Sequence, residues 1–134
     1  MDGKVRLGSP KYMAPELIKR EEHDEKVDVW ALGVIAFELL TKGTAPFNER
    51  LGKEVMFGLI KKKPYNISAL RKANVSANCL EFIEACLIKD PKQRPSASEL
   101  LRYDWICGRT SEASTESIDR INENVVQFQY LNPF

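Results

Sequence analysis

The strongest feature of the hydrophobic pattern is residues 27–40, where 11 of 14 side chains are apolar and surround a helix instead of forming one stripe. A helix that is apolar all round needs neighbours on nearly all sides. At about 1.5 Å per residue it spans roughly 21 Å, short of the ~30 Å bilayer core. It ends just before Gly43, a residue type typical of helix C-termini. The pattern therefore predicts the buried central helix of a globular domain.

Three further segments have amphipathic spacing. The stretch 77–88 stops at a proline and places Cys79 and Cys86 on one face as small buried hydrophobes. Ser96 and Glu99 form a capping box that opens a short helix. The stretch 50–62 ends before a proline and is expected to place five apolar residues on one side: Leu51, Val55, Met56, Leu59 and Ile60. No run alternates as a strand does, so the prediction is an all-α fold.

The C-terminal segment, residues 107–134, has a different pattern. It begins with a polar linker over 109–114. Apolar residues then recur with a heptad-like spacing of 3, 4 and 3, at Ile118, Ile121, Val125 and Phe128. We expect one domain over 1–106, followed by this linker and an amphipathic tail helix that folds back on the domain.

Composition and charge exclude several classes of partner. The 134 residues carry 20 Lys and Arg against 19 Asp and Glu, a net charge of +1, and 43% of them are hydrophobic. This mix is typical of a globular chain. The near-neutral total removes the electrostatic argument for nucleic acid or an anionic membrane as a partner. The charge is uneven, with net values of −1 over 1–50, +5 over 51–102 and −3 over 103–134.

Cysteine and histidine give no sign of a metal centre. The three cysteines contain no C-x-x-C pair, so neither a disulfide framework nor a zinc site follows from their spacing. His23 is the only histidine, which excludes a His-based metal cluster or triad within this chain. The N-terminus lacks the apolar run of a signal peptide, and we expect a cytoplasmic protein without a metal site.

A cluster of functional residues begins at Gly8-Ser9-Pro10, which is typical of a turn. Pro15 suits the first turn of a helix, and Glu16 favours a helix N-terminus. Ala14-Pro15-Glu16 resembles the A-P-E motif that closes the activation segment of protein kinases.

Further motifs follow in the order found in that family. Asp28, Trp30 and Gly33 resemble the D-x-W-x-x-G opening of the central kinase helix. The segment 89–96, which contains Arg94, resembles D-P-x-x-R-P-S, and the segment 103–106, with Trp105, resembles a variant of H-P-W-[IF]. Together these motifs cover about residues 8–106. The resemblance implies a partial kinase domain over 1–106, a C-terminal helical lobe around one buried central helix.

The resemblance also implies a substrate class and a docking surface. Gly8 and Ser9 stand before Tyr12 as in serine/threonine kinases, not tyrosine kinases. The Ser9 hydroxyl would help to seat the acceptor residue; the alternative is a turn serine that caps its own backbone. Glu38 matches a position that in some kinases receives a substrate arginine; equally, it could face a basic group of its own chain. The expected substrate-docking residues are Gly8, Ser9, Pro10, Tyr12 and Glu38, with the helix 50–62 as a further docking element.

Other residues are expected to support the lobe. The family resemblance implies a buried salt bridge between Glu16 and Arg94, which lie 78 residues apart. It implies that Asp28 accepts hydrogen bonds from the backbone of the catalytic loop; the alternative is an acid at a helix start. The residues expected to be structural are Ala14, Pro15, Glu16, Asp28, Trp30, Gly33, Arg94 and Trp105.

The parts that carry out phosphoryl transfer are missing from the sequence. It has no G-x-G-x-x-G loop, V-A-I-K lysine, H-R-D aspartate or D-F-G aspartate. We therefore expect no catalytic residue and no cofactor site in this chain, with ATP and magnesium bound only by a longer parent kinase. The expected partners are protein or peptide substrates and the missing N-terminal portion of the kinase. The chain alone should be inactive and should expose an apolar patch where that portion would pack.

Two alternatives remain open. The chain could be a non-catalytic kinase-like module that binds substrates or regulators. The tail is similar to the regulatory junction of calcium/calmodulin-type kinases, although its acidic balance departs from the basic helices that calmodulin prefers.

Overall fold

The computed structural model describes residues 9–108, and the expected tail helix and Gly8 lie outside this range. Every regular element within it is helical, which confirms the predicted all-α class. In chain order the elements are the 3₁₀ helix η2 (Pro10–Tyr12), α1 (Pro15–Ile18), α2 (Lys26–Leu40), α3 (Lys53–Lys62), α4 (Ile67–Lys72), α5 (Ala77–Cys86), α6 (Ala97–Leu100) and α7 (Asp104–Cys107). The longest, α2, has 15 residues, and no described helix is long and apolar enough to cross a bilayer.

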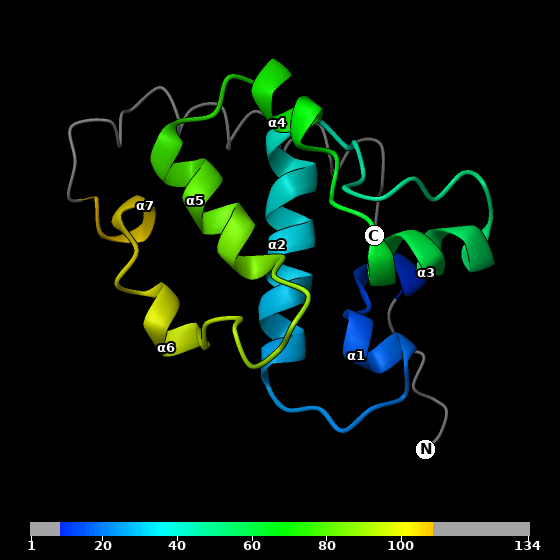
Figure 1. Cartoon of the computed structure of the whole chain (residues 1–134). Coiled ribbons are helices and arrows are strands. Elements are labelled where there is room, and N and C mark those ends of the chain that lie inside the picture. The colour runs from blue at the N-terminus through cyan, green and yellow to red at the C-terminus, as the bar shows by residue number, and fades with distance from the viewer. Residues whose placement is uncertain (1–8, 109–134) are drawn as a thin grey trace.

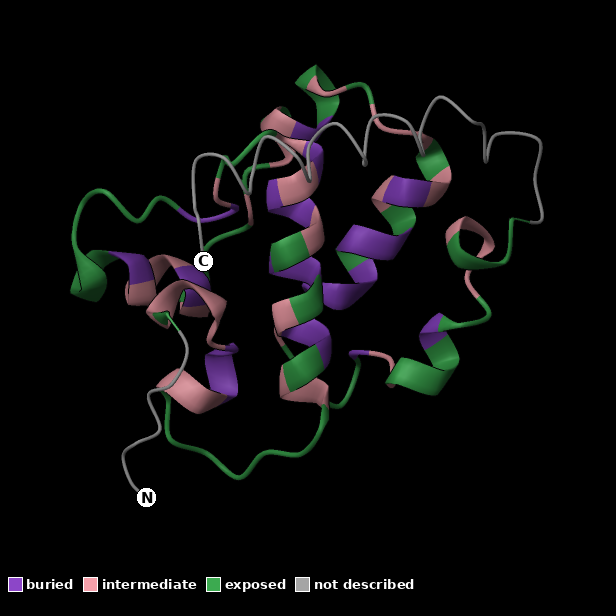
Figure 2. Cartoon of the chain, turned by 180° about the vertical axis from the view of Figure 1, so that it is seen from behind, coloured by how far each residue is buried: buried purple, intermediate pink, exposed green. Residues whose placement is uncertain are grey.

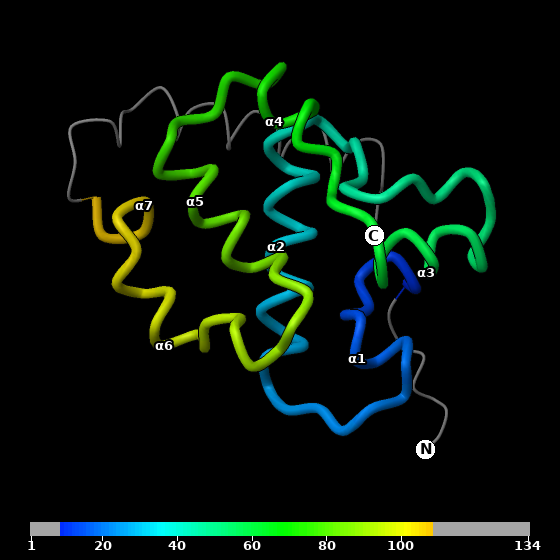
Figure 3. Tube along the Cα trace, in the orientation of Figure 1, coloured from blue at the N-terminus to red at the C-terminus, as the bar shows by residue number. Residues whose placement is uncertain are grey.

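Helix α2 is the axis of the lobe (Figure 1). Helix α5 packs along one side of it, with α7 packed on α5, and η2 contacts α2 on the other side. Helices α1 and α3 contact each other on this second side. The tube in Figure 3 shows the long connections, one from α1 to the start of α2 and one from the end of α2 out to α3.

The core consists of the inward faces of α2, α3 and α5 (Figure 2). Trp30 and Phe37 of α2 are fully buried, and Cys79 and Cys86 of α5 are buried as predicted. Burial raises the pKa of the Cys86 thiol to about 12, so this side chain is a protonated apolar group at neutral pH.

One face of α2 remains open. Leu32 and Ile35 are 44% and 42% exposed, although the all-round apolar pattern calls for cover on every side. The two residues are three apart and therefore share a face. Helix α5 and η2 pack against other sides of α2. The larger apolar patch expected of the chain alone stays a prediction.

The prediction for α3 was partly wrong. The helix begins at Lys53. The preceding residue, Gly52, has a positive φ of 105°, so the helix does not extend back to Leu51. Leu51 therefore lies before the helix and is 64% exposed. Met56 and Ile60 point inward as predicted, but Val55 faces outward and is 46% exposed. The helices α4 and α7 were not predicted, and α5 ends at Cys86, two residues earlier than expected.

Candidate functional site

Glu16 and Arg94 form a bidentate ion pair inside the lobe. Arg94 Nη1 lies 2.8 Å from Glu16 Oε2, and Nη2 lies 2.9 Å from Oε1. Each residue is only 1% exposed. Parallel N–H···O bonds of this kind are the strongest geometry for a guanidinium and a carboxylate. The pairing that the family resemblance implied is therefore present.

Arg94 also satisfies backbone groups of two other segments. Its Nη1 donates to the carbonyl of Lys26 at 2.9 Å, Nε to Ile88 at 2.8 Å, and Nη2 to Lys89 at 3.2 Å. The guanidinium carbon lies 5.2 Å from the ring centroid of Trp30. One side chain thus connects α1, the start of α2 and the segment after α5.

The other residues expected to be structural lie around this pair. Ala14 and Pro15 are buried at the start of α1, and Trp30 stacks on Phe47 with ring centroids 6.0 Å apart. Trp105 is half-buried in α7 against Phe82, with centroids 5.0 Å apart. The indole Nε1 of Trp30 is buried and has no hydrogen-bond acceptor among residues 9–108.

The segment that precedes α1 is attached to α2 by Tyr12. Its hydroxyl donates to Glu38 Oε1 at 3.0 Å. Burial raises the pKa of Tyr12, and the charge and hydrogen bond of Glu38 raise it further, so the phenol stays protonated and keeps donating. Ser9 is exposed and caps η2, where its Oγ accepts from the backbone N–H of Lys11 at 3.4 Å. The segment 9–16 is thereby held at two points, at Tyr12 and at Glu16.

Glu38 faces a basic group of its own chain. It is 1% exposed, and its Oε2 lies 3.0 Å from Lys11 Nζ. This arrangement corresponds to the second of the two alternatives for Glu38. The sequence pattern assigned no role to Lys11, because its partner Glu38 lies 27 residues away along the chain. The position of Lys11 next to Tyr12 was the one signal that could have indicated its role.

A groove of about 1160 Å³ lies between this segment, the start of α2 and α3. It brings together Ser9, Tyr12 and Asp28, whose proximity the spacing alone did not predict. Asp28 is exposed, and within the described part of the chain its carboxylate has no hydrogen-bond donor. The remaining lining residues are mostly apolar, with charges at Arg20, Lys53 and Glu54.

Sequence comparison identifies the lobe. The protein kinase domain family matches residues 2–106. The chain belongs to the protein kinase family. Serine/threonine-protein kinase H1 homolog of Pinctada fucata is 35% identical over 94% of this chain and 30% of the relative. Serine/threonine-protein kinase H1 of Homo sapiens is 34% identical over 92% of the chain and 29% of the relative.

Human calcium/calmodulin-dependent protein kinase type 1B is 36% identical over 78% of this chain and 30% of its own length. The chain thus spans about 30% of the length of these relatives.

Lys89 is a partly buried cation of the kinase lobe that the sequence pattern did not single out. Its Nζ lies 4.5 Å from the ring centroid of Phe47 and 5.6 Å from that of Trp30, and it donates to the carbonyl of Ile60 in the last turn of α3. It therefore connects α3 to the core around α2. Burial lowers the pKa of Lys89 from its ordinary value of 10.5 to about 8.

This shift predicts a pH dependence of stability. The folded state releases the Lys89 proton near pH 8, while the unfolded chain holds it up to about pH 10.5. Between these values the unfolded state binds more protons, so the contribution of Lys89 to stability rises with pH. We expect the melting temperature of the wild type to rise relative to Lys89→Met from pH 7.5 to 9.5. NMR titration of the Lys89 side chain should give a midpoint near 8; a midpoint above 10 would contradict the prediction.

Proposed function

We propose that this chain is the substrate-docking and scaffold portion of a serine/threonine protein kinase. The parent enzyme would transfer the γ-phosphate of ATP to Ser or Thr hydroxyls of protein substrates. The observation that carries the proposal is the segment Ser9–Glu16, fixed by Tyr12 to Glu38 and by Glu16 to Arg94 along a groove that also contains Asp28.

Residues on different sides of this groove have different roles in the proposed reaction. The exposed Ser9 hydroxyl would help to seat the acceptor residue, and the groove would take the surrounding peptide. The carboxylate of Asp28, which has no donor among residues 9–108, would accept backbone hydrogen bonds from a catalytic loop that the N-terminal portion supplies. The same portion would cover Leu32 and Ile35, whose exposure leaves room for it.

We expect no ATP–magnesium site in this chain. Residues 9–108 contain no group of three or more His, Cys, Asp or Glu side chains placed to hold a metal ion. The sequence also lacks the glycine-rich loop and the lysine that hold the phosphates. Catalysis would therefore belong to the parent kinase.

Mg-ATP should leave the melting temperature of the purified chain unchanged. A ligand that binds the folded state raises this temperature by mass action, and a chain without the site gains nothing. Differential scanning fluorimetry with and without millimolar Mg-ATP measures this, with a full-length related kinase as the positive control. A saturable rise of several degrees in this chain would contradict the assignment.

A non-catalytic binding module is the second candidate, favoured by the lack of all four phosphoryl-transfer motifs. The coding sequence upstream of Met1 separates the two. An open frame that encodes H-R-D and D-F-G supports the kinase, and its longer product should phosphorylate Ser- or Thr-containing peptides. Absence of these motifs, together with a protein of this size in cells, supports the module.

A further inference from the structure

The ammonium of Lys11 lies between two carboxylates from different parts of the chain. It is 3.0 Å from Glu38 Oε2 and 3.7 Å from Glu49 Oε2. The Glu38 side chain is 1% exposed and that of Glu49 is 43% exposed. The other Glu38 oxygen accepts from Tyr12, so each Glu38 oxygen already faces a group of the same chain, Oε1 in a hydrogen bond and Oε2 in an ion pair.

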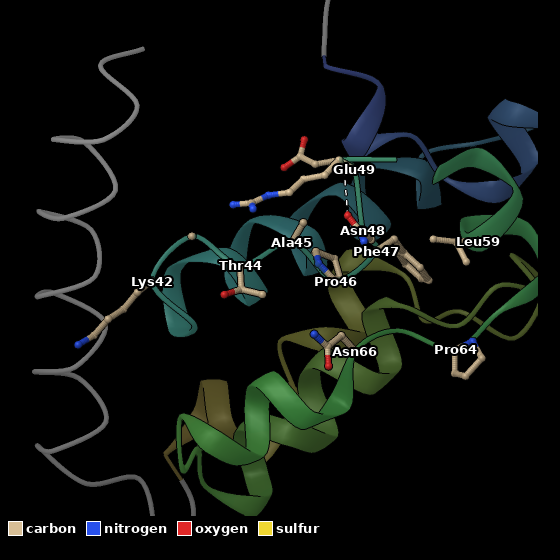
Figure 4. A pocket seen from close by; sticks show the side chains of 12 residues that line it. Lys42, Thr44, Ala45, Pro46, Phe47, Asn48, Glu49, Leu59, Pro64 and Asn66 are labelled. Carbon is tan, nitrogen blue, oxygen red and sulfur yellow. Dashed lines mark hydrogen bonds between the residues drawn. The ribbon is translucent and has the colours of Figure 1, made fainter. Parts of the chain in front are cut away.

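The surroundings form a cation site that reaches the surface. A buried carboxylate without a counter-charge is strongly unfavourable, so Glu38 requires a cation. The ring of Tyr12 lies 5.4 Å from the Lys11 ammonium and adds a cation–π contact. The site is open on the Glu49 side because that side chain is 43% exposed. Glu49 also lines a hollow of about 690 Å³ beside the connection from α2 to α3 (Figure 4), which neither Lys11 nor Glu38 lines.

We infer that Glu38 and Glu49 form a cation site that Lys11 occupies from within the chain, which makes Lys11 a specificity-determining residue that closes the site to basic groups of a peptide. Without Lys11 the two carboxylates would lose the cation between them, and because the Lys11 side chain is 19% exposed, the vacated position would reach solvent. A guanidinium suits it, because its planar fork donates to more than one carboxylate oxygen. The peptide part of this inference rests on the proposed docking function, whereas the cation site itself does not.

The protonation of Lys11 supports this occupancy. Burial lowers the pKa of Lys11, but the hydrogen bond and charge of Glu38, together with Tyr12 and Glu49, more than offset it, so the pKa is raised. Lys11 therefore carries its charge throughout the physiological range, and the site remains filled.

Argininamide provides a direct test on the purified chain. It should bind Lys11→Ala about tenfold or more tightly than the wild type, since loss of one partner from a close charge pair leaves the other unpaired. Lys11→Arg keeps a cation in place and should behave as the wild type. Glu38→Gln added to Lys11→Ala should abolish the gain. Calorimetry measures binding, and the melting temperature of Lys11→Ala should rise with argininamide.

Two results would overturn the inference. One is equal affinity of the wild type and Lys11→Ala for argininamide, and the other is an affinity gain that survives Glu38→Gln. If Lys11→Ala unfolds, argininamide should restore its helical circular dichroism, and failure to restore it also overturns the inference.

Paired peptides then test the docking function. Two labelled serine peptides that differ only in Arg against Gln should bind the wild type within about twofold of each other, and Lys11→Ala should favour the Arg peptide about tenfold. Lack of binding of either peptide to any variant, alongside the argininamide result, would refute the docking function and leave the cation site in place. Binding of both peptides without the Arg preference in Lys11→Ala would overturn the specificity role of Lys11.

Discussion

Replacement of Arg94 by methionine should lower the free energy of unfolding by about 3–5 kcal/mol, because it leaves the buried Glu16 carboxylate without its cation. Glu16 is 1% exposed and accepts hydrogen bonds from both Nη groups of the Arg94 guanidinium. The substitution also removes the donors to three backbone carbonyls, at Lys26, Ile88 and Lys89. Arg94→Met should therefore be among the most destabilising single changes in the lobe.

Two matched variants separate the charge from the backbone bonds. The double variant Glu16→Met with Arg94→Met has no unpaired carboxylate, so it should be more stable than Arg94→Met alone. It should still fall below the wild type, because the three carbonyls remain without a donor. Arg94→Lys keeps the charge but lacks the fork, and should lie in between. Urea unfolding followed by circular dichroism measures all three; a loss under about 1 kcal/mol for Arg94→Met would contradict the argument.

Local features of the fold could be predicted from the sequence because local physics determines them. The central helix was expected over 27–40 and extends over Lys26–Leu40. The capping box of Ser96 and Glu99 is present with both of its hydrogen bonds. In each case the residues that decide the structure are neighbours along the chain. The pair of Glu16 and Arg94, by contrast, came from the family resemblance, since no local rule joins residues 78 apart.

The features that were missed depend on packing between elements. Gly52 makes α3 begin after Leu51, and the packing of α3 against the lobe buries Met56 and Ile60 while Val55 stays outside. Periodicity alone could place neither Leu51 nor Val55. The partner of Glu38 is Lys11, which only the fold brings within reach. Helix α4 spans just six residues, too few for a periodic signal, although Asn66 caps it by accepting from the backbone of Ala69.

Gly33→Ala should destabilise the lobe by about 1–3 kcal/mol through overpacking. A Cβ at Gly33 would lie 2.5 Å from Cys86 Cβ, closer than real Cβ atoms approach other atoms, and 3.1 Å from Leu87 Cδ2, which is a tight contact. Cys86 and Leu87 are buried in and just after α5, so they can move away only if α5 shifts from α2. The higher helix propensity of alanine, about 1 kcal/mol, works in the opposite direction and is outweighed by the clash.

Gly58→Ala is the matched control, because Gly58 lies within α3 and a Cβ there meets no atom within 4 Å. This change should stabilise the chain by up to about 1 kcal/mol. The difference between the two changes in the free energy of unfolding isolates the packing of α2 on α5. Equal changes in the two variants would show that this contact is loose. A shift of α5 would also move the Ile88 carbonyl that Arg94 holds. The double variant Gly33→Ala with Arg94→Met should therefore lose less free energy of unfolding than the sum of the two single losses, because the shift of α5 already weakens the contact that Arg94 makes.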